Sequence, residues 1–168
     1  MKVKMYMAIS LNGYIAKENN EVDWMQEAQW ESYDREVAAS GHILLGRRTY
    51  EMLEDEELNV DCQYYVLTSN EAPTQKDNVT FLPLDVVRIR ETLEQNNAEE
   101  VLVIGGAKTN SFLLNAGFID EVMIDIEPLI LSRGINLIES LKEDIKLELI
   151  STGVVAEGLL QLKYKVIN

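Results

Sequence analysis

The sequence contains almost no thiol or imidazole chemistry, with Cys62 and His42 as the single cysteine and histidine among 168 residues. One cysteine cannot form a disulfide within the chain, and zinc sites of the Cys/His type take about three or four such ligands. We therefore expect no metal, and a zinc-dependent nucleobase deaminase is excluded. Cys62 begins an apolar, strand-like segment, which argues against a Cys–His nucleophile.

Long apolar runs and an excess of positive charge are also missing. No apolar segment reaches the roughly 18 residues of a membrane helix. Residues 1–7 alternate polar and apolar side chains, unlike a signal peptide, so we expect a cytoplasmic protein. The formal net charge of -14 makes nucleic acid and anionic membranes poor partners. A phosphate-bearing cofactor would need local positive groups and helix N-termini.

What the sequence does contain is an alternation of strand-like and helix-like segments over 168 residues, the size of a single domain. Four helices are predicted at residues 26–39, 49–53, 85–95 and 108–115. Eight strands are predicted at residues 3–9, 43–45, 63–68, 79–82, 101–104, 121–126, 146–151 and 159–166. This order predicts an α/β fold with a mostly parallel central sheet flanked by helices.

The last two predicted strands differ from the others because no helix separates them. Residues 152–158 are interpreted as the connection of an antiparallel C-terminal hairpin. Asp85 is expected to cap the helix that follows it, and Gly41 and Gly117 are placed to end helices. The acidic stretch 51–57 is expected to be a solvated loop.

The first strand-to-helix junction that indicates chemistry is Gly46-Arg47-Arg48-Thr49. The unpaired N–H groups and positive dipole end of a helix start form an anion site, and arginine adds bidentate phosphate contacts. The spacing alone is equally consistent with an ordinary helix start whose arginines are solvated.

The second junction is Gly105-Gly106-Ala107-Lys108-Thr109, again between an apolar strand and a helix. Paired glycines let the backbone approach a ligand closely, although a plain tight turn is the alternative. The segment is not GxGxxG, which disfavours an ordinary Rossmann site. Two phosphate-binding junctions on one sheet still suggest a dinucleotide, because its pyrophosphate and its outer phosphate need separate sites.

Four segments, taken in order, resemble a known family: Ser-Leu-Asn-Gly-Tyr-Ile-Ala at 10–16, Leu-Gly-Arg-Arg-Thr-Tyr-Glu at 45–51, Val-Ile-Gly-Gly at 103–106 and Ile-Asp-Glu at 119–121. The chain is similar to the dihydrofolate-reductase-like superfamily. It most resembles the C-terminal reductase domain of the bacterial riboflavin-biosynthesis deaminase-reductase. The resemblance spans essentially the whole chain. It implies NADPH-dependent reduction of a pyrimidine or pteridine-like substrate, as in 5-amino-6-(5-phosphoribosylamino)uracil reductase.

The resemblance also implies where the cofactor binds. Backbone positions at Ala8 and Ile15 would hold the nicotinamide carboxamide, and Thr68, with Ser69 beside it, would lie near the adenosine 2′-phosphate. The remaining phosphate-binding positions are Gly46, Arg47, Arg48, Thr49, Gly105, Gly106, Ala107, Lys108 and Thr109. A cis or otherwise strained Gly105–Gly106 peptide and a symmetric homodimer through the C-terminal strands are implied as well.

The residues that would carry catalysis depart from the family pattern. Asn12 stands where the family usually has aspartate, and an amide is not a general acid or base near neutral pH. Counting back from the Gly-Arg motif, Trp30 occupies the position of the pterin-binding carboxylate of dihydrofolate reductases. The catalytic candidates are Asn12, Glu31 and Asp34, with water as another proton donor. Trp24 or Trp30 is either a pocket wall or a substrate-stacking residue.

Three alternatives to the reductase interpretation remain at the level of sequence. In the first, the chain is a non-catalytic nucleotide-binding paralogue. In the second it is a dihydrofolate reductase, and in the third it is a protein with an interaction role only. The change at position 12 favours the first, and the missing pterin carboxylate argues against the second.

Overall fold

The computed structural model describes residues 1–53, 58–70 and 77–167, so part of the expected acidic loop at 51–57 lies outside the described residues. Eight strands form the main sheet: β1 (Lys2–Ser10), β3 (His42–Gly46), β4 (Gln63–Leu67), β5 (Val79–Leu82), β6 (Glu100–Val103), β7 (Glu121–Glu127), β9 (Lys146–Ala156) and β10 (Leu159–Ile167). The described helices are α1 (Glu27–Ser40), α2 (Arg47–Met52), α3 (Val86–Gln95) and α4 (Ala107–Asn115).

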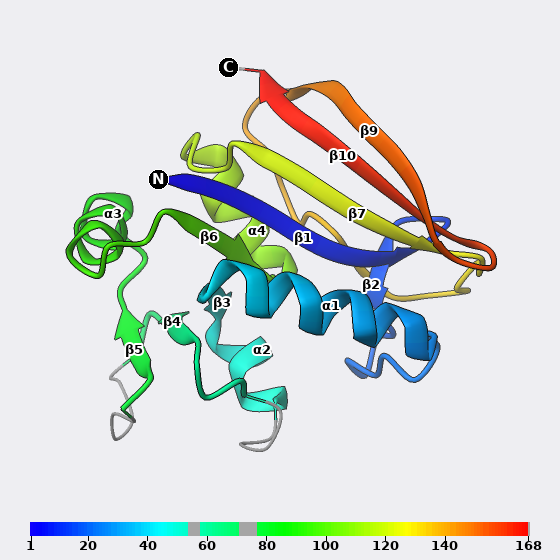
Figure 1. Cartoon of the computed structure of the whole chain (residues 1–168). Coiled ribbons are helices and arrows are strands. Elements are labelled where there is room, and N and C mark those ends of the chain that lie inside the picture. Colours follow the sequence, from blue (N-terminus) through cyan, green and yellow to red (C-terminus); the bar gives the residue numbers. More distant parts are fainter. Residues whose placement is uncertain (54–57, 71–76, 168) are drawn as a thin grey trace.

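The sheet has the order β5-β4-β3-β6-β1-β7-β10-β9 and is mostly parallel (Figure 1). The strands from β5 to β7 pair in parallel, whereas β10 is antiparallel to both β7 and β9. Strand β1 lies between β6 and β7, with Met5 opposite Val103 and Ala8 opposite Asp125. The predicted fold class and the C-terminal hairpin are thus confirmed.

Helices cover both faces of the sheet, which explains why its central strands are almost continuously apolar. On one face Ile89 and Leu93 of α3 and Leu113 of α4 pack with Val3 and Met5 of β1. On the other face Val37 of α1 packs with Ile43 and Leu45 of β3. Figure 1 shows α1 crossing one face while α4 lies behind the sheet.

The ends of the helices follow the capping residues in the sequence. Asp85 caps α3, with its carboxylate accepting hydrogen bonds from the N–H groups of Val87 (2.9 Å) and Arg88 (3.3 Å). Gly41 ends α1 in the left-handed conformation, and Gly117 adopts the same region just after α4. Within the described residues, no helix is both long and apolar enough to span a membrane.

The hairpin differs from the prediction, because residues 152–156 belong to strand β9 and not to the connection. Only Glu157 and Gly158 form the turn, and a register shift follows between Leu159 and Leu160. Gly158 has a φ of 77°, which a glycine adopts without steric cost, so two residues suffice to reverse the chain.

A second, two-stranded sheet was not predicted. It pairs β2 (Tyr14–Ala16) antiparallel with β8 (Ile135–Asn136). Strands of three and two residues are too short to show a periodic pattern, so the sequence gives no strand signal there. This small sheet matters because it brings Ile15 towards the ends of β3 and β6.

Candidate functional site

The structure brings the two strand-to-helix junctions together. Strands β3 and β6 are parallel neighbours, so both end at the same edge of the sheet. There the Gly46 N–H donates to the carbonyl oxygen of Gly105 at 2.8 Å. The approach is so close that a Cβ atom on Gly46 would run into the Thr109 hydroxyl. Gly46 is therefore required by the contact between the junctions.

The glycine pair lies under two further predicted site residues. The Gly105–Gly106 peptide is cis, as expected. A Cβ on Gly106 would lie 3.5 Å from the Thr49 hydroxyl oxygen and 4.0 Å from Cδ1 of Ile15. Residues from β2, α2 and the start of α4 thus meet around one short piece of backbone.

Both helices at this meeting point begin without a side-chain cap. Gly46 is the N-cap residue of α2 and Gly106 that of α4, and neither end has a capping hydrogen bond from a side chain. The first N–H groups of a helix have no intrahelical acceptor, so uncapped starts can bind an anion. Lys108, in the first turn of α4, is exposed.

The two arginines of the first junction have different surroundings. The Arg47 Nε atom lies 2.6 Å from Glu51 Oε1, one turn along α2, and Arg47 is half-buried. Arg48 is exposed and forms no ion pair with any residue in the described parts of the chain. Of these two arginines, Arg48 is thus the one that can turn towards a ligand without breaking an ion pair.

Thr68 and Ser69 line a pocket at the ends of β4 and β5, along the same edge of the sheet. Its cavity volume is about 360 Å³, and the remaining lining residues are Asn70, Phe81, Leu82, Pro83 and Leu84. The Thr68 hydroxyl accepts a hydrogen bond from the Asn70 N–H at 3.2 Å, and so it shapes the turn that follows β4. This pocket and the glycine junctions thus lie along the same edge of the sheet, where the parallel strands end.

Three hydrogen bonds hold the Asn12 side chain within the chain. Its Oδ1 atom accepts from the Ser10 hydroxyl (2.8 Å) and from the Leu131 N–H (3.1 Å), while its Nδ2 donates to the Leu131 carbonyl (2.8 Å). These contacts tie the turn after β1 to the segment after β7. Asn12 therefore has a structural role here, whatever it contacts in a complex.

The acidic candidates on α1 lie on its exposed surface. Glu31 and Asp34 are exposed, and the residues of α1 that are buried against the sheet include Gln29 and Ser32. Gln29 and Glu31 differ by two positions, which is a rotation of about 200° around a helix. Glu31 therefore lies on the opposite side of α1 from Gln29.

The two tryptophans occupy different environments. Trp30 is 41% exposed and packs edge-on against Tyr33. Trp24 is half-buried, and its indole N–H is shielded from solvent with no acceptor among the described residues. Of the two, Trp24 has the polar group that still needs a partner.

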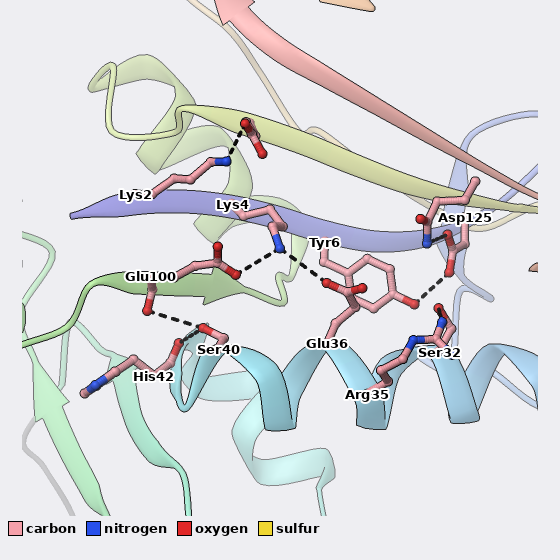
Figure 2. A network of polar contacts seen from close by, with 12 residues as sticks. Lys2, Lys4, Tyr6, Ser32, Arg35, Glu36, Ser40, His42, Glu100 and Asp125 are labelled. Carbon is pink, nitrogen blue, oxygen red and sulfur yellow. Dashed lines mark hydrogen bonds and ion pairs between the residues drawn. The ribbon is translucent and has the colours of Figure 1, made fainter. Parts of the chain in front are cut away.

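A buried group of polar residues beneath α1 was not predicted as a site. We call Tyr6, Gln29, Asp125 and Gln161 the polar cluster; part of it is visible in Figure 2. The Tyr6 hydroxyl donates to Asp125 Oδ2 at 2.7 Å and accepts from Gln29 Nε2 at 2.8 Å. Gln161 Nε2 donates to Asp125 Oδ1 at 2.9 Å.

The charge of the polar cluster affects its tyrosine. Asp125 is fully buried and forms no ion pair among the described residues. Burial, followed by the negative charge of Asp125, raises the pKa of Tyr6 far above its usual value of 10, so this phenol stays neutral and continues to donate. The sequence signal was available, because Asp125 interrupts the apolar run from Val122 to Ile126.

Similar polar contacts continue along α1. Gln26 donates to both carboxylate oxygens of Glu127, from its backbone N–H (2.9 Å) and from Nε2 (2.8 Å). Lys4 Nζ lies between Glu100 (2.9 Å) and Glu36 (3.3 Å), as Figure 2 shows. Hydrogen bonds and ion pairs thus hold helix α1 on the sheet together with the packing of Val37.

Known proteins show the same architecture. A family model described as the RibD C-terminal domain matches residues 1–161. The uncharacterized protein YwjB of Bacillus subtilis (strain 168) is 31% identical over 97% of this chain and 97% of its own length.

Two solved structures illustrate the fold. A putative riboflavin biosynthesis protein from Shewanella sp. PV-4 has a TM-score of 0.83 at 24% identity and covers 100% of both chains. Dihydrofolate reductase from Enterococcus faecalis, complexed with NADP(H), has a TM-score of 0.73 at 19% identity, covering 99% of this chain and 97% of that one. The expected dihydrofolate-reductase-like fold is confirmed.

Proposed function

The chain belongs to the RibD C-terminal domain family, and we propose that it is an NADPH-dependent reductase of a small pyrimidine or pteridine-like heterocycle. The observation that carries this proposal is the meeting of two uncapped helix starts at Gly46 and Gly105–Gly106. Their N–H groups provide one anion site, and the Thr68–Ser69 pocket provides a second position along the same edge.

The residues present fit a phosphorylated dinucleotide. Gly105 and Gly106 would receive the pyrophosphate, because the space that a Cβ on Gly106 would fill is bordered by Thr49 and Ile15. Arg47 and Arg48, together with Lys108 and Thr109 of α4, would add charge and hydrogen bonds. Thr68 and Ser69 would lie near the adenosine 2′-phosphate.

The nicotinamide end of the cofactor would lie against the end of β1, at Ala8, and against Ile15 on β2. When bound, NADPH supplies the hydride. The chain would align donor and acceptor and exclude water, with α1 covering this part of the sheet. Asn12 is tied to Leu131, and Glu31 and Asp34 are exposed. We propose water as the proton donor, with the exposed carboxylates of Glu31 and Asp34 as the alternatives.

The reductase proposal is tested by following NADPH oxidation at 340 nm with a panel of pterins, lumazines and aminopyrimidines. Oxidation that depends on one of these substrates supports it. The engagement of Asn12 in the chain favours one second function, a non-catalytic nucleotide-binding protein. NADPH binding without oxidation of any panel member would favour that second function.

We also propose that the protein assembles as a symmetric homodimer through its C-terminal strands. Strand β9 lies at the edge of the sheet, and several of its apolar side chains and those of β10 are exposed: Leu147, Leu149, Ile150, Val154 and Leu160. An exposed apolar edge is an aggregation hazard unless a partner covers it. A two-fold axis would let the same patch cover itself.

A further inference from the structure

The polar cluster contains one atom that lacks a partner. Gln29 is only 2% exposed, and its Nε2 donates to the Tyr6 hydroxyl. Its Oε1 atom is shielded from solvent and accepts no hydrogen bond from any described residue. Buried polar groups are almost always paired, and an unpaired one is costly. The Oε1 atom of Gln29 therefore still needs a hydrogen-bond donor, and no described residue supplies one.

The chemistry of the cluster determines which atom of Gln29 stays open. A carboxylate only accepts hydrogen bonds, so the single hydrogen of the Tyr6 hydroxyl is directed to Asp125. The Tyr6 oxygen must then accept, and only the Nε2 end of the Gln29 amide can donate to it. The amide is therefore fixed with Oε1 free, and the cluster presents an acceptor rather than a donor.

The unpaired acceptor is on the face of the sheet where the substrate is expected. Asp125 is the register partner of Ala8, and Tyr6 and Ala8 lie on the same face of β1 because strand side chains alternate. Gln29 is in the first turn of α1, which covers that face. The position of the nicotinamide at Ala8 is taken from the proposed function, and the inference rests on it.

We propose that Gln29 is a specificity-determining residue whose Oε1 accepts a hydrogen bond from an N–H group of the heterocyclic substrate. The site then selects rings of the lactam or cyclic imide type that carry a free N–H, and it discriminates against their N-alkylated counterparts. Tyr6 and Asp125 are positioning residues, since they act by orienting the Gln29 amide.

A matched pair of pteridine probes tests this proposal. Lumazine has two ring N–H groups, and 1,3-dimethyllumazine has none. Each is titrated into the full chain saturated with NADP⁺, with tryptophan fluorescence as the readout. The unmodified chain is expected to prefer lumazine by about tenfold or more, the usual effect of pairing a buried acceptor. Gln29→Leu is expected to bind both probes within about twofold of each other.

Two further variants separate recognition from folding. Gln95→Leu makes the same change on the exposed surface of α3 and should keep the preference for lumazine. Tyr6→Phe keeps Gln29 but releases its amide, so it should give an intermediate preference. Gln29→Met replaces Gln29→Leu if thermal unfolding shows that the leucine variant does not fold.

The outcomes are distinguishable from those of the proposed function, because NADPH affinity is measured on every variant by calorimetry. Intact NADPH affinity together with an undiminished preference for lumazine in Gln29→Leu would overturn the role of Gln29. So would equal binding of the two probes by the unmodified chain. Failure of that chain to bind NADPH would instead overturn the proposed function, and with it the placement on which this inference rests.

Discussion

Arg47 and Arg48 are neighbours in sequence, but they would contribute differently to cofactor binding. Arg47 already has Glu51 as a partner, so a phosphate must compete for it, whereas Arg48 is exposed. We predict that replacing Arg47 or Arg48 with alanine weakens NADPH binding, and that at least one replacement costs about 1–3 kcal/mol, the range of a charge-assisted contact.

Calorimetric titration with NADPH measures this effect. Arg88→Ala, an exposed arginine on α3, serves as the control and should leave the affinity unchanged. Wild-type affinity in both the Arg47 and the Arg48 variants would contradict the assignment of this junction to the cofactor.

The contact between Gly46 and Thr109 gives a prediction about stability. A Cβ on Gly46 would collide with the Thr109 hydroxyl, whereas the Thr109 Cβ would be 3.7 Å away, an ordinary contact. Gly46→Ala should therefore lower the free energy of unfolding by about 1–3 kcal/mol, as overpacking does. The same change in a Thr109→Ala background should cost clearly less. Chemical denaturation of the unmodified chain, the two single variants and the double variant measures these costs. An equal cost of Gly46→Ala in both backgrounds would refute the steric explanation.

At the scale of residues, the sequence located the two glycine junctions but not Gln29 of the polar cluster. Glycine at a strand end followed by cations is a pattern of adjacent residues, so it can be recognised without knowing the tertiary contacts. Gln29 could not be found in this way, because counting residues from the Gly-Arg motif led to Trp30 and Glu31. Which side of a helix faces the sheet depends on its partners, and Asp125 is almost a hundred residues away.

Among the elements, α1 shows again that the sequence predicts where a helix lies better than which of its faces is buried. Its bounds agree with the prediction to within one residue, because Gly41 ends it. Its buried face is polar, with Gln29, Ser32 and Ser40 as well as Val37, so no apolar stripe identified that face. The strands β2 and β8 were missed for another reason, since they are too short to show a pattern and their pairing is decided by tertiary contacts.

The cap of α3 allows a direct test at this scale. Asp85 accepts from two N–H groups of the first turn, so Asp85→Ala should lower the free energy of unfolding by about 0.5–2 kcal/mol. Asp85→Ser keeps a capping oxygen and should recover most of that loss. Equal destabilisation by alanine and serine in urea titrations would show that the cap is not the source of the effect.

For the whole molecule, the proposed dimer is checked by light scattering at micromolar concentration. The expected mass is twice 19.1 kDa, with an interface that buries more than about 1,000 Å² in total. Leu149→Glu should return the protein to a monomer, because it places a charge in the exposed apolar patch of β9. Val60→Glu changes an apolar residue that is 82% exposed elsewhere and is the control. A mass near 19.1 kDa for the unmodified chain would rule out a stable dimer.

The whole chain carries a net charge of -14, so a phosphorylated cofactor must find its partners in a small part of the molecule. A crystal structure of the complex with NADPH tests the location of this binding site most directly. We predict the nicotinamide between Ala8 and Ile15, the pyrophosphate at Gly105–Gly106, and the 2′-phosphate beside Thr68 and Ser69. NADPH bound elsewhere on the chain, with the glycine junctions empty, would contradict the account.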